Sequence, residues 1–145
     1  MTPINIAHSE RDNNRIVLVE DQSNVIIVDG DMAAKMWHRL EDLGKLCAGW
    51  DGPDSKAISS NAINCMKDVL RNVKDEQLRH WILFPDGRGF LYLDYTKDDL
   101  SAGISLEDKA IKYFAMRGME IVDKSDAMDL NADNVLRILE EIYVG

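Results

Sequence analysis

The sequence predicts a single α+β domain in which a helix pair and a C-terminal helix pack on an antiparallel β-meander, next to an N-terminal β-hairpin. Three observations lead to this fold class. The chain has 145 residues, which fits one domain of ordinary size. Apolar residues have helical spacing in some stretches and form short strand-like runs in others. Predicted helices and strands are segregated along the chain, as in α+β domains whose helices cover one face of a sheet.

The N-terminal part divides into a polar arm, residues 1–14, and the start of the domain, which we expect to comprise residues 15–145. Residues 15–19 and 24–28 are rich in β-branched side chains, and residues 20–23 separate them. This pattern predicts a β-hairpin with a four-residue loop. Because both runs are almost wholly apolar, we expect both faces of the hairpin to be covered or paired.

Two amphipathic helices follow the hairpin. Asp31 is expected to cap the first helix, and Gly49, which can adopt the left-handed conformation, is expected to end it. Ser59 or Ser60 should open the second helix, and because the link is short, the helices should pack as an antiparallel pair. The apolar stripes are Met32, Met36, Trp37, Leu40, Leu43, Leu46 and Cys47 in the first helix, and Ala62, Ile63, Met66, Val69, Leu70 and Val73 in the second.

The middle of the chain has the pattern of a four-stranded meander. Its turns are only four or five residues long, which favours antiparallel neighbours. The polar segment 117–130 is expected to be irregular and to lead to a final helix capped by Asn131 or Asp133. The four strands are expected at residues 80–84, 90–95, 102–106 and 111–116.

Large side chains occur on both faces of the predicted meander. Tyr92 alternates with Leu91 and Leu93 along the second strand, and Tyr113 is followed by Phe114 in the fourth. Helices should cover one face. The other face is either covered by the N-terminal hairpin, which we favour, or exposed as a surface for a partner.

The charge of the chain disfavours several classes of function. Asp and Glu number 26 against 17 Lys and Arg, which gives a net charge of -9 and an isoelectric point near 4.7. Such a protein repels nucleic acids and anionic membranes, so we expect neither general nucleic-acid binding nor membrane association. A basic protein partner remains open. Residues 59–79 carry a net charge of +1, so the rest of the chain carries -10.

We expect a cytoplasmic protein, because the sequence has neither the pattern of a secretory signal nor an apolar run of membrane-spanning length. Cys47 and Cys65 lack zinc or redox spacing, and each falls on an apolar helix position, so we expect two reduced thiols in the core. The histidines also lack metal-binding spacing. We therefore expect no metal, no cofactor and no catalytic residue.

Two segments of the chain together resemble a known pattern. Residues 46–53, LCAGWDGP, join a helix to a Trp-Asp-Gly turn with a second helix behind it. Residues 84–87, FPDG, are followed by FLYLD, GISLE and IKY in the next strands. This arrangement resembles a loose group of small uncharacterised bacterial proteins, in which a helix–WDG turn–helix unit precedes a P-x-D-G hairpin and a short meander. The resemblance covers about residues 40–115 and implies a fold without implying an activity. Members of the group look like the cargo of mobile elements and of defence or toxin neighbourhoods.

The two turns of this pattern supply most of the candidate binding residues. In the first turn, Trp50 should fold back onto the helix pair, and the Asp51 carboxylate should either accept backbone N–H groups or take part in binding. In the second, residues 85–89 have the composition of a hairpin turn, and Arg88 at its tip could contact an anionic partner. The candidate binding residues are Trp50, Asp51, Asp86, Arg88 and Tyr92.

Three hypotheses about function follow. The favoured one is a non-enzymatic interaction module, of the immunity, antitoxin or mobile-element accessory type, that binds a basic surface of a protein partner. Its oligomeric state is left open. The first alternative is an enzyme with a dispersed acid/base site near His80, Asp86 and Asp51, which requires two of these side chains within hydrogen-bond reach. The second is an acidic mimic of nucleic acid, which requires a row of surface carboxylates at phosphate-like spacing.

Overall fold

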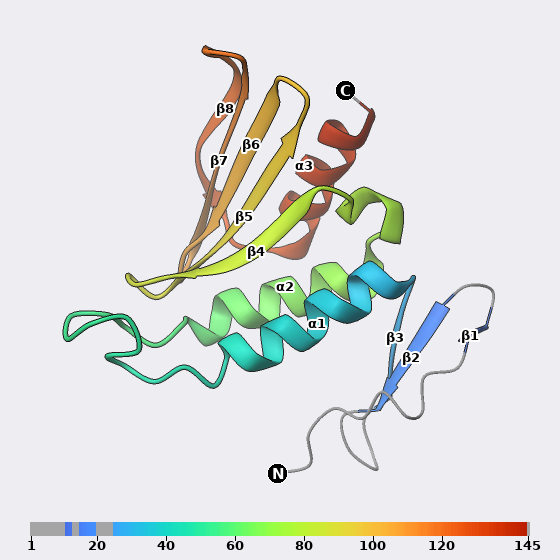
Figure 1. The fold of residues 1–145 in the computed structure, drawn as a ribbon, viewed down its shortest axis with the longest axis vertical. Helices are drawn as coiled ribbons and strands as arrows, with labels where there is room; N and C mark the ends of the chain where they lie inside the picture. The colour runs from blue at the N-terminus through green and yellow to red at the C-terminus, as the bar shows by residue number, and fades with distance from the viewer. Residues whose placement is uncertain (1–10, 13–14, 20–24, 145) are drawn as a thin grey trace.

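The computed structural model describes residues 11–12, 15–19 and 25–144 (Figure 1). It confirms the predicted fold class, with α-helices, an antiparallel five-stranded sheet and an N-terminal hairpin. The elements in chain order are β1 (Arg11–Asp12), β2 (Arg15–Val19), β3 (Val25–Val28), α1 (Asp31–Leu43), α2 (Ser60–Asn72), the 3-10 helix η2 (Asp75–Leu78), β4 (Trp81–Asp86), β5 (Phe90–Lys97), β6 (Leu100–Leu106), β7 (Ala110–Arg117), β8 (Glu120–Asp129) and α3 (Ala132–Val144).

The helix pair α1 and α2 lies between the two sheets. On one side β2 contacts α1 and β3 contacts α2, and on the other side β4 contacts α1 and β5 contacts α2. Figure 1 shows this arrangement, with the small sheet below the helices, the large sheet above them and α3 beside the large sheet. The hairpin therefore packs on the helices rather than on the outer face of the large sheet, which corrects our expectation for that face.

The hairpin has one buried face and one exposed face. Ile16, Leu18 and Val28 are buried against the helices, whereas Val25 and Ile27 are exposed. Our expectation that both faces are covered is therefore wrong, because the helix pair lies on only one side of the small sheet. Arg11–Asp12, expected in the polar arm, pair with β2 as β1. The rest of the arm and the predicted loop at 20–23 lie outside the described residues.

The large sheet is an antiparallel meander in the order β4-β5-β6-β7-β8. Its first four strands confirm the prediction, but the fifth, β8, occupies most of the segment 117–130 that we expected to be irregular. The helix-facing side chains of the sheet join the apolar stripes of the helices in one core. They are Trp81, Leu83, Leu91, Leu93, Tyr95, Ala102, Ile104, Leu106, Ile111, Tyr113 and Ala115.

The start of α1 is capped from a distant segment. Asp31 is the first helical residue rather than the cap, and the N-cap position is Gly30, which has no side chain to offer. Instead, the Ala33 N–H donates to Asp75 Oδ1 at 2.7 Å, and the Asp75 N–H donates to Asp29 Oδ2 at 2.8 Å. This pair of hydrogen bonds joins the starts of α1 and η2.

α1 ends at Leu43, before Gly49, where we expected its end. Gly49 has a φ of 88° but lies in the loop between the helices. The early end leaves Cys47 exposed, whereas Cys65 on α2 is buried, so only Cys65 is a core thiol. Burial, followed by the nearby Asp68 carboxylate, raises the pKa of the Cys65 thiol to about 11.

The predicted caps of the other two helices are confirmed in part. Ser59 Oγ accepts a hydrogen bond from the Ala62 N–H at the start of α2. Before α3, Asn131 Oδ1 accepts a hydrogen bond from the Asn134 N–H at 2.9 Å. In the part of the chain that the structure describes, none of the helices combines the length and apolar character needed to cross a membrane.

Candidate functional site

The WDG turn and the PDG turn, far apart in sequence, lie against each other. The Lys56 N–H donates to the Gly87 carbonyl at 2.8 Å, and the Ser59 N–H donates to the Gly89 carbonyl at 2.9 Å. The two turns border an open groove of about 380 Å³. Three of the candidate residues therefore line one groove, namely Asp51, Asp86 and Arg88.

Ser55 and Trp50 hold the WDG turn together. The Trp50 Nε1–H donates to the Lys56 carbonyl at 2.8 Å, and Trp50 also packs against the core, as predicted. The Ser55 hydroxyl accepts from the Asp51 N–H at 2.9 Å and donates to the Gly52 carbonyl at 2.7 Å. The Asp51 carboxylate, expected either to accept backbone N–H groups of the turn or to take part in binding, makes no hydrogen bond within the described part of the chain. It is therefore free to face solvent or a partner.

Asp86 and Arg88 form an ion pair at the tip of the PDG turn. Arg88 Nε donates to Asp86 Oδ1 at 3.0 Å, and Arg88 Nη2 donates to Asp86 Oδ2 at 2.9 Å. The hydrogen bond to Arg88 lowers the pKa of the Asp86 carboxyl. The guanidinium also lies 4.9 Å from the centre of the Phe90 ring. A carboxylate held in this way is a poor general base, because its proton affinity is reduced.

Tyr92 belongs to a different surface, the outer face of the large sheet. Its ring stacks on Phe84 across β4 and β5, with ring centres 5.9 Å apart and planes inclined by 8°. Its side chain also lies over Gly103 on β6, in space that a Cβ would occupy. Burial, followed by the Asp94 carboxylate, raises the pKa of the Tyr92 hydroxyl. Tyr92 is thus part of an aromatic layer rather than of the groove between the turns.

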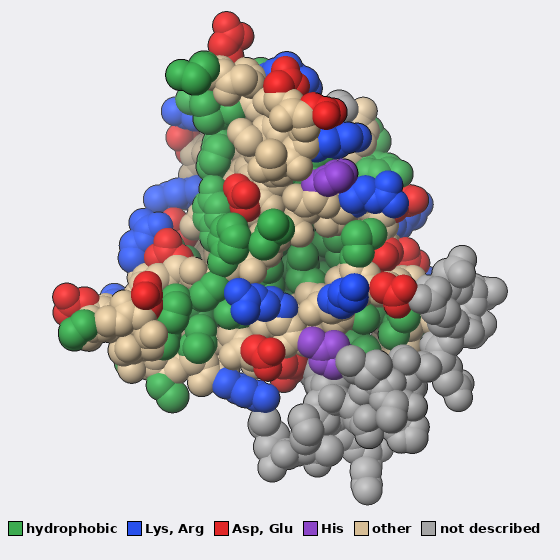
Figure 2. Space-filling view, viewed as in Figure 1, with side chains coloured by type: hydrophobic (Ala, Val, Ile, Leu, Met, Phe, Trp, Pro, Cys, Tyr) green, Lys and Arg blue, Asp and Glu red, His purple; other side chains and the backbone are tan. Residues whose placement is uncertain are grey.

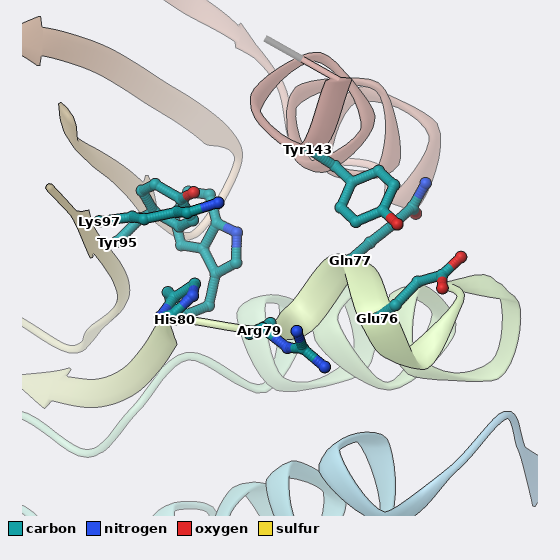
Figure 3. A pocket seen from close by; sticks show the side chains of 8 residues that line it. Glu76, Gln77, Arg79, His80, Tyr95, Lys97 and Tyr143 are labelled. Atoms are coloured by element: carbon teal, nitrogen blue, oxygen red, sulfur yellow. The ribbon is translucent and has the colours of Figure 1, made fainter.

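His80 does not join Asp51 and Asp86. It precedes β4, whereas Asp86 is the last residue of that strand, which places the two about 20 Å apart at about 3.3 Å per residue. His80 lines a separate cavity, shown in Figure 3. Asp51 and Asp86 share a groove but no hydrogen bond. The geometry expected for the dispersed acid/base site is therefore not assembled from these three residues.

Asp123, Asp126 and Asp129 lie along β8 at intervals of three residues. The pairing of β7 with β8 has two register shifts and Lys124 follows Asp123 directly, so the regular row of carboxylates required of a nucleic-acid mimic is interrupted. Among the described residues, no group of three or more His, Cys, Asp or Glu side chains is placed to hold a metal ion.

Comparison with protein-family models, curated proteins and solved structures finds no match. The interpretation of the site therefore rests on its geometry.

Two surfaces carry features that sequence reasoning missed. One is β8, which exposes both apolar and acidic side chains. The other is the cavity beside His80, to which Arg79, Lys97 and Tyr143 contribute from three separate segments. No local spacing links these residues in the sequence, so only the unusual His80-Trp81 pair drew attention to that region.

Proposed function

We propose that the protein is a non-enzymatic interaction module of the cytoplasm that binds a basic surface of a protein partner. One observation carries this proposal. β8 is an edge strand of ten residues that, among the described residues, pairs with β7 alone and is exposed along almost its whole length. Free backbone groups at a sheet edge can pair with an added strand. The type is that of an immunity, antitoxin or mobile-element accessory protein, in line with the group that the sequence resembles.

The charge of this edge supports a basic partner. Residues 120–145 contain seven Asp and Glu against two Lys and Arg, a net charge of -5 out of the total of -9. Asp123 on β8 and Glu141 on α3 both act on Tyr113, whose pKa is raised to about 12 by burial and then by these carboxylates. Carboxylates of both elements therefore lie within electrostatic reach of Tyr113, and such carboxylates would attract a cationic partner.

Exposed apolar side chains adjoin the carboxylates. Met119 is 94% exposed, Ile121 61% and Val122 54%, at the turn between β7 and β8 and at the start of β8. Figure 2 shows carboxylates and apolar side chains next to each other at the top of the molecule, where this turn lies in Figure 1. Protein interfaces combine an apolar centre with a polar rim, and this hairpin offers both.

The proposal is tested with basic proteins encoded beside this chain. The chain is co-expressed with each of them, and a complex is expected to co-purify and to associate more slowly at high salt. Asp126→Lys should slow association by about tenfold, because it reverses a charge on β8. Asp54→Lys, an equal charge change on the exposed WDG turn, is the matched control and should leave the rate nearly unchanged. Equal effects of the two variants, or no complex with any basic neighbour, would contradict the proposal.

A further inference from the structure

A cavity of about 560 Å³ lies where the chain enters the large sheet (Figure 3). This volume is within the range of roughly 300–1,000 Å³ that is typical of small-molecule sites. Its walls come from η2, the link from η2 to β4, the end of β5 and the last turn of α3. The lining residues are Glu76, Gln77, Arg79, His80, Trp81, Tyr95, Lys97 and Tyr143.

Four of the eight lining residues carry aromatic rings, and the backbone of His80, one of these four, is strained. His80 has a φ of 72°, a left-handed conformation that side-chain-bearing residues adopt at a cost of about 1–2 kcal/mol. The His80 and Tyr95 rings meet edge to face, with ring centres 6.0 Å apart. The Trp81 ring also contacts Tyr95, with ring centres 5.0 Å apart. Figure 3 shows Tyr143 on the opposite side of the cavity. Such a site can hold a flat ring.

The polar side chains of the cavity are mainly hydrogen-bond donors. Arg79 and Lys97 form no ion pair or side-chain hydrogen bond within the described residues, although the protein is strongly acidic. Glu76 is the one carboxylate in the lining, and Asp98 lies close enough to Tyr95 to add to the burial that raises its pKa. Two unpaired cations in a concave site favour a ligand that brings its own negative charge.

We propose that this cavity binds a small aromatic anion, a flat ring that carries a phosphate or a carboxylate. The anionic group lies between Arg79 and Lys97, and the ring packs on the wall formed by His80 and Tyr95. The side chains of Gln77 and Glu76 are then available to contact polar atoms at the edge of the bound ring. None of the residues that line the cavity belongs to β8.

Four probe molecules test the contributions of the ring and of the anionic group separately. Phenyl phosphate has the ring and the charge, inorganic phosphate has the charge alone, phenol has the ring alone, and benzoate replaces phosphate by carboxylate. Binding is followed by two-dimensional NMR at the ring signals of His80 and at the Trp81 indole N–H. Phenyl phosphate should saturate with a Kd of about 1 mM, and inorganic phosphate and phenol should each bind about tenfold more weakly. The ratio of phenyl phosphate to benzoate affinity identifies the preferred anion.

Two variants test the two halves of the site separately. His80→Gly removes the ring at a position whose φ suits glycine, so the protein should stay folded. It should reduce phenyl phosphate affinity to that of inorganic phosphate and leave inorganic phosphate binding unchanged. Lys97→Gln should lower the affinity for phenyl phosphate and for inorganic phosphate by about fivefold and leave the affinity for phenol unchanged. Far-UV circular dichroism verifies that each variant is folded.

The matched control is Lys124→Gln, which removes the same charge from an exposed position on β8. It should leave the affinity of every probe unchanged. The proposal is overturned if phenyl phosphate binds no tighter than inorganic phosphate, or if the protein signals that it shifts belong to residues outside the cavity. It is also overturned if Lys124→Gln weakens binding as much as Lys97→Gln does. The last result would show attraction by overall charge alone.

Discussion

Gly103 marks the point at which the aromatic layer of the outer sheet face is closest to the backbone. A Cβ at this position would overlap Tyr92 Oη and Phe114 Cε1 and would lie 2.8 Å from Tyr92 Cζ. The backbone of Gly103 needs no left-handed conformation, so the requirement for glycine here is one of space. The sequence contains this glycine but gives no sign that two rings from neighbouring strands cover it.

We therefore expect Gly103→Ala to lower the free energy of unfolding by about 1–3 kcal/mol, because Tyr92 must leave its stack on Phe84 to make room. Urea denaturation measures this change. Gly44→Ala is the control, because Gly44 has ordinary helical angles and its nearest neighbour would be 3.4 Å from the new Cβ. It should be neutral or stabilising by up to about 1 kcal/mol. A destabilisation of equal size in both variants would contradict this account.

The ion pair of Asp86 and Arg88 makes a pH-dependent contribution to stability. Because the hydrogen bond from Arg88 lowers the pKa of Asp86 in the folded state, the contribution is fully present above the unfolded pKa of about 3.9. It is lost as the pH falls through the lower folded value. The contribution is small, because the pair is largely exposed.

Arg88→Ala should therefore raise the pKa of the Asp86 carboxyl toward its ordinary value, as measured by an NMR pH titration. The difference in stability between the wild type and this variant should shrink as the pH falls through the lowered folded pKa of Asp86, because the carboxyl then becomes protonated in both. Arg71→Ala breaks a similar surface pair with Asp68 and serves as the control. An Asp86 pKa that does not respond to Arg88→Ala would contradict the role given to this hydrogen bond.

At the scale of elements, sequence patterns predicted those that have one buried face. The stripes of α1 and α2 and the first four strands of the large sheet repeat with the periods of helices and strands, because burial on one face imposes those periods. β8 has almost no buried face, so its side chains were not constrained to alternate and the strand was missed. It forms because the edge of β7 offers backbone partners.

The cap of α1 by Asp75 shows a second limit of local patterns. A capping side chain is normally sought just before a helix, but Gly30 at that position has no side chain that could accept a hydrogen bond. Asp75→Ala should lower the free energy of unfolding by about 1–2 kcal/mol, because the Ala33 N–H loses its acceptor. Chemical denaturation measures this loss. Glu76→Ala, the exposed neighbour, should change stability by less than about 0.5 kcal/mol. Similar losses in both variants would contradict the capping role.

At the scale of the whole molecule, the sequence predicted the layers but not their order. We expected the hairpin on the outer face of the sheet, but it packs on the helices, and its apolar sequence alone does not specify which surface it covers. The candidate site was predicted in the same incomplete way. Asp51, Asp86 and Arg88 were named separately, and their common groove results from hydrogen bonds between two turns that no local pattern encodes.

Because the hairpin, the helices and the large sheet share one core, we expect them to unfold together. Leu18→Ala, a change in the hairpin, should lower the free energy of unfolding of the whole molecule by about 2–5 kcal/mol. Tryptophan fluorescence reports on Trp37 in α1, Trp50 in the WDG turn and Trp81 in β4, and far-UV circular dichroism reports on all elements. The two transitions should coincide in the wild type and in the variant. Separate midpoints would mean that the hairpin unfolds independently.

The two register shifts between β7 and β8 also affect how readily copies of this protein aggregate through their sheet edges. A flat edge of ten residues would be a template on which identical chains could stack into fibrils. Bulges twist such an edge, and the repeated like charges of β8 repel another copy of the same strand. A basic partner meets no such repulsion. Under the proposed function, the carboxylates of β8 would attract a basic partner, while the same charges and the irregular pairing disfavour stacking of identical chains.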